Sequence, residues 1–278
     1  MKIEQVTPVI GAELSGIDLN HLSSNELDDI YGALIEHKVI FFRDQNLTPE
    51  AHLAFAKSFG EPEAPHPIYP SIEGYENIVL LKSGAGSKPD TNDWHKDMTF
   101  KANPPFTSIL HAIQVPDVGG DTMWSNTNAA YTALPLMWQN YLTDMEAIHD
   151  IGTFRNDLYV KGGIEAVNDG LKSTGSAVHK IVDTHPVSGL KYLNVNQSFT
   201  RHIIGEIQGE SDRILQYLYQ HMAKPEFQVR LRWRNNTVAM WDNRITHHYA
   251  ICDYLPKVRH MQRVTVLHDK RELKGVLD

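Results

Sequence analysis

The chain has 278 residues, of which 41% are hydrophobic and 22% are charged, and its formal net charge is −8. This composition is that of an ordinary globular protein and excludes a collagen-like or disordered chain. The negative balance argues against a general affinity for nucleic acid or anionic membranes. A single cysteine, Cys252, excludes an intramolecular disulfide and a thiolate zinc cluster, so any metal must be bound by histidine and carboxylate.

The N-terminal segment carries Glu4, Pro8, Gly11 and Glu13 where a secretory signal would need an unbroken apolar stretch. No run in the sequence approaches the roughly 20 apolar residues of a membrane span. We therefore expect a soluble, cytoplasmic protein. No repeat, low-complexity tract or linker divides the chain, so we expect one domain over residues 1–278.

Two helices are expected near the N-terminus. Ser23 and Glu26 have the spacing of a capping box ahead of an amphipathic pattern, which predicts a helix over 24–37. Residues 48–50 provide an N-cap threonine, a first-turn proline and a first-turn acid, which predict a second helix. Gly60 is expected to end it.

Short apolar, β-branched runs dominate most of the remaining sequence, with turn residues between them. They are VIFF (39–42), NIVLL (77–81), FTSILHAIQV (106–115), DTMWS (121–125), KYLNVN (191–196), FQVRLRW (227–233), TVAMW (237–241) and MQRVTVLH (261–268). Many short strands of this kind predict a mainly β domain, either a sandwich or a jelly roll.

Three further segments interrupt the strand pattern. Residues at about 127–145 and 211–222 have helical patterns. Residues 154–175 contain four glycines and no clean period, so we expect a mobile loop there, with a possible role as a lid.

A possible metal site begins with His95 and Asp97 in the run WHKDMTF. On an extended strand two residues at this spacing project from the same face and could chelate one ion. The pair alone is a weak signal, because 15 histidines make chance matches expected and a strand-end histidine beside a solvated aspartate is an equal alternative. The run WDNRITHHYA (241–250) offers a third imidazole. Two imidazoles and one carboxylate suit Fe(II) and leave positions free for an oxo acid and O₂.

Two arginines, Arg259 and Arg263, are expected on one face of a strand over 259–266. Buried guanidinium groups need partners, and their fork is suited to carboxylate or sulfonate. One bound anion for each arginine is the simplest interpretation. The alternative is that one or both pair with acidic side chains of the protein or lie at a surface edge.

Taken together, these runs closely resemble the 2-oxoglutarate-dependent taurine dioxygenase family, and the likeness covers nearly the whole chain in order. Its motifs are WHKDMTF, GGDTMW (119–124), THPVSG (184–189), KPEFQVRLRW (224–233), WDNRITHHYA, and DYLP before the two arginines. The resemblance implies a double-stranded β-helix, or cupin-like jelly roll, with flanking helices. It also implies Fe(II), 2-oxoglutarate as co-substrate, O₂ and a homo-oligomer.

The resemblance assigns roles position by position. It implies metal ligands at His95, Asp97 and His248, the last being preferred to its neighbour His247 because it directly precedes the Tyr-Ala pair. It places the distal carboxylate of 2-oxoglutarate on Arg259, eleven residues beyond that ligand, with help from Thr122.

Positions for the primary substrate follow from the same resemblance. They are His66 and Arg263 for a sulfonate, Tyr69, Phe154 and Phe199 for the pocket wall, and Thr91, where the family has an asparagine. Threonine at this position weakens the case for taurine itself. Without the resemblance, His66 is more simply a turn residue and the aromatic side chains are more simply packing residues.

The implied reaction hydroxylates the carbon next to a sulfonate, converting taurine into sulfite and aminoacetaldehyde while 2-oxoglutarate becomes succinate and CO₂. Alternatives within the superfamily are cleavage of alkyl sulfates and hydroxylation of phenoxy or other carboxylic acids. More distant alternatives are a non-catalytic anion-binding jelly roll and a zinc hydrolase, although no HExxH motif supports the latter.

Overall fold

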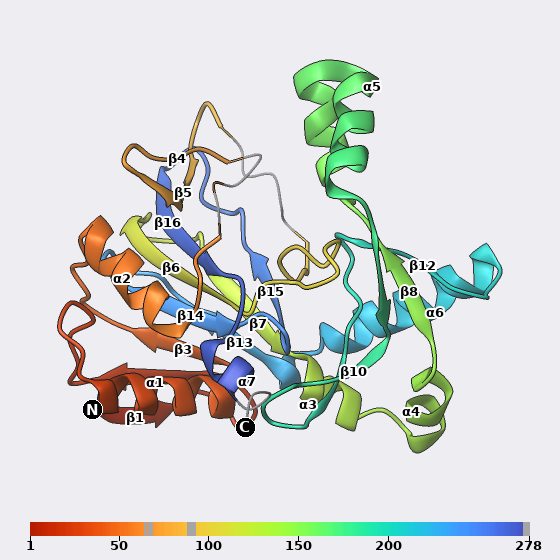
Figure 1. Ribbon diagram of the computed structural model, residues 1–278, viewed down its shortest axis with the longest axis horizontal. Helices are drawn as coiled ribbons and strands as arrows, with labels where there is room; N and C mark the ends of the chain where they lie inside the picture. Colours follow the sequence, from red (N-terminus) through yellow and green to blue (C-terminus); the bar gives the residue numbers. More distant parts are fainter. Residues whose placement is uncertain (64, 66–68, 88–92, 275–278) are drawn as a thin grey trace.

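The computed structural model describes residues 1–63, 65, 69–87 and 93–274, and its core is a pair of facing β-sheets (Figure 1). The larger sheet has eight strands, which in spatial order are β1 (Lys2–Gln5), β2 (Ala12–Ser15), β3 (Val39–Phe42), β14 (Val238–Asp242), β6 (Thr107–Gln114), β16 (Arg259–Val266), β5 (Tyr75–Ser83) and β4 (Ser71–Ile72). All neighbours in it are antiparallel except β2 and β3.

The opposing sheet has three antiparallel strands, in the order β13 (Gln228–Leu231), β7 (Thr122–Asn126) and β15 (Thr246–Ala250). Two smaller sheets extend the molecule, one of β12 (Thr200–Ile203), β8 (Glu146–His149) and β9 (Ala177–Lys180), the other of β10 (Val182–Thr184) and β11 (Lys191–Leu193). The arrangement confirms the predicted jelly-roll core, and each run predicted to be a strand contains one.

The two main sheets enclose an apolar layer of large side chains. Phe41 and Trp241 come from the larger sheet and Trp124 from the smaller, with ring centroids 5.5 Å apart for Phe41 and Trp124 and 5.7 Å for Trp124 and Trp241. All three are at most 2% exposed. Trp241 of this layer also lines the cavity described below.

The outer face of the larger sheet is covered by helices α1 (Ser24–His37) and α2 (Pro49–Phe59). The predicted capping box is present, because the Ser23 hydroxyl accepts from the Glu26 N–H and the Ser23 N–H donates to the Glu26 carboxylate. At α2 only the first of these bonds is present, because the Thr48 hydroxyl accepts from the Ala51 N–H, and Gly60 follows the last residue of the helix. A Cβ at Gly60 would lie 1.9 Å from the carbonyl oxygen of His268, so only glycine fits there.

Two helical predictions need correction. The single helix expected over 127–145 is two helices, α3 (Thr127–Thr132) and α4 (Leu136–Leu142), because Pro135 disfavours helical geometry in the residue before it. The helix expected over 211–222 is confirmed as α6 (Gln208–Met222), with an earlier start. The short elements η1 (Pro225–Phe227) and α7 (Lys270–Lys274) complete the helices of the described residues.

The segment 154–175, expected to be a loop, is helix α5 (Phe154–Thr174), which projects beyond the sheets in Figure 1. Its backbone departs from helical geometry at Gly162 and Gly163, and Gly163 has φ +66°. Gly170 then allows close packing, since a Cβ there would lie 2.5 Å from Leu158 Cδ1. The glycines at 162 and 163 therefore divide the segment into two helical parts that meet at a kink, and these parts pack together at Leu158 and Gly170. No helix of the described residues combines the length and apolar character that a membrane crossing requires.

Candidate metal centre and adjoining cavity

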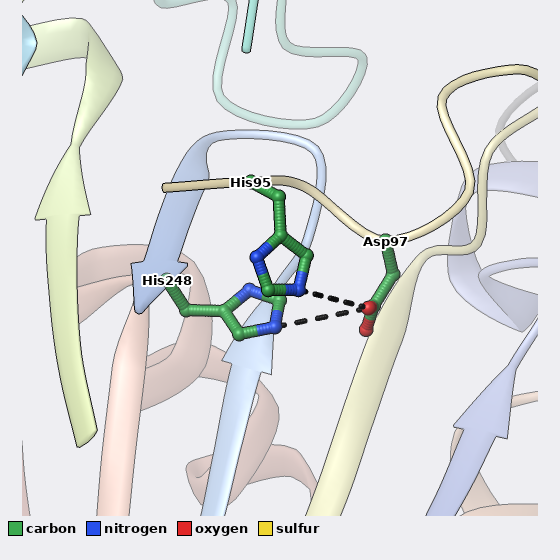
Figure 2. Close-up of side chains that lie close together, drawn as sticks. All are labelled: His95, Asp97 and His248. Carbon is green, nitrogen blue, oxygen red and sulfur yellow. Dashed lines mark ion pairs between the residues drawn. The ribbon is translucent and has the colours of Figure 1, made fainter. Parts of the chain in front are cut away.

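Three buried side chains from two distant parts of the sequence meet in the space between the two main sheets. His95 Nε2 lies 3.9 Å and His248 Nε2 lies 3.7 Å from Asp97 Oδ1. Figure 2 shows both ring nitrogens directed toward that carboxylate. One ligand atom from each residue lies within 4.8 Å of the others, and the three residues are 6–7% exposed. The structure thus brings together the three residues that the sequence analysis selected.

The first two of these residues lie on a loop, which corrects the expectation of a strand. His95 forms an isolated antiparallel bridge with His248, in which the His95 N–H donates to the His248 carbonyl at 3.0 Å and the His248 N–H donates back at 2.8 Å. The chain then turns at 97–100, where Met98 has φ +55°. His95 and Asp97 can therefore reach one ion from a loop. The bridge fixes the His95 imidazole beside that of His248, and the chain turns at Asp97.

Asp97 is fixed by two side chains that the sequence analysis did not identify. The Asn243 amide accepts from the Asp97 N–H at 2.8 Å and donates to its carbonyl at 3.0 Å, so it holds the backbone from both sides. The Ser108 hydroxyl donates to Oδ2 at 2.8 Å, which leaves Oδ1 facing the histidines. Asn243 lies in the WDNRITHHYA run, but nothing in that run shows that it reaches Asp97.

The imidazoles are oriented so that Nε2 is available as a ligand atom. His95 Nδ1 lies 2.8 Å from the Asp93 carbonyl oxygen, which accepts its proton and leaves the Nε2 lone pair free. Burial lowers the pKa of His248 to about 3, so this imidazole is neutral near pH 7. Burial opposes ionisation of Asp97, yet the charge of Arg263 and the neighbouring imidazoles hold the pKa of its carboxyl below the usual range. His247 lies on the opposite face of β15 and is not part of the cluster.

Lys96, between the two loop ligands, is 1% exposed and anchors the loop. Its Nζ donates to the Arg244 carbonyl at 2.8 Å, Asn194 Oδ1 at 3.2 Å and the Leu193 carbonyl at 3.4 Å, and it lies 4.2 Å from the centroid of the Tyr192 ring. Burial lowers its pKa to about 7. These contacts join the loop to the β14–β15 turn and to the end of β11.

A cavity of about 460 Å³ opens beside the three residues. Its described lining is largely apolar, with Met98, Leu80, Leu81, Leu110, Tyr69, Phe154, Phe199 and Trp241, and both arginines of β16 reach it. Phe154 and Phe199 pack against each other with centroids 5.6 Å apart, and Tyr69 lies edge-on to Phe154 at 6.5 Å. The predicted pocket aromatics therefore share one wall. His66 and Thr91 lie outside the described residues.

Arg259 occupies one end of this cavity with most of its donors free. Its Nε donates to the Gly120 carbonyl at 3.0 Å and its Nη2 to Thr122 Oγ1 at 3.2 Å. Within the described part of the chain it makes no ion pair, and burial lowers its pKa. A buried guanidinium without a carboxylate partner is costly, so an anionic ligand fits this position. Gly120 makes room for it, since a Cβ there would lie 3.3 Å from Arg259 Cδ.

Arg263 lies nearer the three candidate metal ligands. Its Nη1 donates to Asp97 Oδ1 at 3.3 Å, while its buried Nε has no hydrogen-bond partner among the described residues. The same-face prediction for the two arginines is thus confirmed, since both line one cavity. The alternative interpretation was that the arginines pair with carboxylates of the protein. It holds in part for Arg263, which contacts Asp97, whereas Arg259 has no such partner among the described residues.

The donor set fits a divalent metal ion. Two imidazole nitrogens and one carboxylate oxygen converge from one side, and the cavity lies on the other, so coordination positions would stay open toward it. Such open positions distinguish a catalytic metal site from a closed structural one.

Comparison with known proteins agrees with this geometry. The family model described as taurine catabolism dioxygenase TauD, TfdA family matches residues 2–265. The chain is 36% identical to an alkylsulfatase of Acinetobacter baylyi, covering 96% of this chain and 84% of that protein. It is also 36% identical to an alpha-ketoglutarate-dependent sulfate ester dioxygenase of Pseudomonas putida, covering 96% and 89%.

Solved structures agree as well. A taurine dioxygenase from Burkholderia xenovorans superposes with a TM-score of 0.83 at 35% identity, covering 96% of this chain and 89% of that one. A complex of AAD-2 with Mn(II) and N-oxalylglycine gives a TM-score of 0.81 at 26% identity, covering 96% and 97%. The chain therefore belongs to the TauD/TfdA family and is a 2-oxoglutarate-dependent dioxygenase.

Proposed function

We propose that the enzyme oxygenates a small sulfate ester or sulfonate that carries an apolar chain. His95, Asp97 and His248 would hold Fe(II), which supplies the activation of O₂ when bound. Arg259 and Thr122 would bind the distal carboxylate of 2-oxoglutarate, and Arg263 would bind the substrate anion. The observation that carries the proposal is the cavity itself, which is lined by three candidate metal ligands, two buried guanidinium groups and an apolar wall.

The overall reaction balances with these components. One oxygen atom of O₂ enters succinate as 2-oxoglutarate loses CO₂, and the other becomes a hydroxyl on the substrate carbon next to the sulfur group. The hydroxylated product then separates into an aldehyde and sulfate, for an ester, or sulfite, for a sulfonate. The protein residues position both anions and exclude water from the reacting centre.

The cavity lining favours an apolar chain over taurine. Among the described lining residues Asp97 is the only carboxylate, and its Oδ1 faces the imidazoles and Arg263, so it does not offer the ammonium of taurine a partner. An uncharged alkyl or aryl group would instead contact Phe154, Phe199 and Leu80. The sulfate ester activity named for the Acinetobacter and Pseudomonas relatives supports the same class.

A substrate panel tests the proposal. Hexyl sulfate, hexanesulfonate, taurine, hexanoate and phenoxyacetate are each supplied with Fe(II), 2-oxoglutarate and O₂, and succinate is measured together with sulfate or sulfite. Burial of each methylene contributes about 0.8 kcal/mol, so kcat/KM for a hexyl compound should exceed that for taurine about tenfold or more. Preference for taurine would reject the apolar-chain assignment, and preference for a carboxylate would reject the sulfur-acid assignment.

A further inference from the structure

The hydroxyl of Thr122 has two donors directed at it. Trp233 Nε1 donates to Thr122 Oγ1 at 2.9 Å, and Arg259 Nη2 donates to the same oxygen at 3.2 Å. Thr122 is 3% exposed, Trp233 is 4% exposed and Arg259 is 8% exposed, so no bulk water competes for these bonds. Thr122 also lines the cavity.

A threonine hydroxyl has two acceptor lone pairs and one hydrogen. With both lone pairs occupied by N–H groups, the hydroxyl hydrogen must point away from Trp233 and Arg259. Arg259 Nε is bound to the Gly120 carbonyl, so its remaining guanidinium hydrogens and the Thr122 hydrogen are the donors left for an anion at this end of the cavity. This end of the cavity therefore offers a bound anion only hydrogen-bond donors.

From this we infer that Trp233 is a positioning residue for 2-oxoglutarate, which fixes the Thr122 hydroxyl as a donor to its distal carboxylate. The inference rests on the proposed role of Arg259 and Thr122. Without the indole N–H, the hydroxyl could rotate and its hydrogen would no longer be directed to the ligand. Trp233 would act through Thr122, without touching the substrate.

The fold explains why the indole stays in place. Trp233 follows β13, whose last residue Leu231 is paired with Thr122 across the β13–β7 ladder. Its ring packs on Trp124 with centroids 6.3 Å apart, and the Arg259 guanidinium carbon lies 5.9 Å from its centroid. Indole nitrogen is a donor only, so this position cannot accept a proton from Thr122.

The test measures binding of 2-oxoglutarate to the Mn(II)-loaded enzyme by anaerobic calorimetry. Trp233→Phe keeps an aromatic ring and removes the N–H. One neutral hydrogen bond is worth a factor of about three to ten, so the dissociation constant should rise by that factor while Mn(II) affinity changes little. Trp138→Phe, which alters a tryptophan stacked on Tyr217 outside the cavity lining, is the matched control.

A double-mutant cycle separates positioning from general packing. In a Thr122→Val background the hydroxyl is absent, so Trp233→Phe should weaken 2-oxoglutarate binding no further. An equal loss in both backgrounds, or none in the wild-type background, overturns the inference. Failure of the wild-type enzyme to bind 2-oxoglutarate at all would instead reject the proposed function.

A second measurement covers the case in which Trp233→Phe does not fold. In ¹⁵N-indole spectra of the five tryptophans, one N–H resonance should shift on Thr122→Val and, in the wild-type protein, on addition of 2-oxoglutarate. If no single indole resonance responds to both changes, the inference is wrong.

Discussion

Arg263 Nη1 lies 3.3 Å from Asp97 Oδ1, the same oxygen that faces the Nε2 atoms of His95 and His248. One guanidinium therefore adjoins the proposed metal carboxylate, while its Nε remains buried without a described partner. A substrate anion on Arg263 would sit close to the metal ligands. Binding of the substrate and the electrostatics of the metal centre are consequently linked through a single side chain.

Arg263→Ala should act mainly on the primary substrate. Loss of a charge-assisted contact is expected to lower kcat/KM for hexyl sulfate about 10- to 100-fold, chiefly through KM. The dissociation constant of 2-oxoglutarate should change less than about twofold, because Arg259 is untouched. Arg263→Lys keeps the charge without the fork and should give an intermediate value. Steady-state kinetics and calorimetry check this, and a loss confined to 2-oxoglutarate would exchange the roles of the two arginines.

Asp97→Ala should weaken Mn(II) binding by more than about 100-fold, since even the partners of metal ligands are commonly worth 10- to 100-fold. Asp93→Asn is the matched control, because the Asp93 side chain is exposed and only its carbonyl oxygen contacts His95. Calorimetric titration with Mn(II) distinguishes the two variants. Equal affinities in Asp97→Ala and the wild-type protein would refute the ligand assignment.

Much of the site could be predicted because its chemistry is concentrated in short runs. The spacing of His95 and Asp97, a third imidazole before Tyr249, and two arginines four apart on one strand are all visible in the sequence. Strand alternation alone predicts that Arg259 and Arg263 share a face.

The residues that support this site could not be found in the same way. Asn243, Ser108 and Trp233 act across strand pairings, and the sequence does not show which strands lie side by side. Helix α5 was expected to be a loop because its glycines were interpreted as breakers; Gly162 and Gly163 do interrupt the helix, but helical geometry resumes on both sides of them and Gly170 allows contact with Leu158. Its role as a lid stays a prediction.

Lys96→Met should lower both stability and metal affinity. The change keeps the length of the chain but leaves the Arg244 and Leu193 carbonyls and Asn194 Oδ1 without their shared donor. Each buried unsatisfied group costs about 1–3 kcal/mol, so we expect a loss of roughly 2–4 kcal/mol in the free energy of unfolding.

Denaturant unfolding and Mn(II) titration measure the two effects of Lys96→Met. Lys57→Met is the control, since Lys57 is exposed in the last turn of α2. If Lys96→Met is as stable as the wild-type protein and binds Mn(II) equally well, the anchoring role is wrong.

His52 and His111 should make the protein less stable as the pH falls below about 6.5. Their rings lie 5.9 Å apart in the interior between α2 and β6, and burial lowers the pKa of His52 to about 3 and that of His111 to about 4. An unfolded histidine titrates near 6.5, so below that pH the unfolded state binds protons that the folded state excludes. The sign is therefore a loss of stability with acid, amounting at pH 5 to about 2 kcal/mol for His52.

His52→Gln isolates this contribution from those of the other buried histidines. Glutamine cannot titrate, and its amide can still donate to the Ile109 carbonyl, which lies 3.2 Å from His52 Nε2. The difference in unfolding free energy between pH 7.5 and pH 5, from denaturant titrations, should shrink by about 2 kcal/mol in this variant. His21→Gln, at a side chain that is 85% exposed, is the control at a histidine outside the interior. An identical pH dependence in His52→Gln and the wild-type protein would show that His52 binds the same number of protons in the folded and unfolded states over this pH range, and the prediction would be wrong.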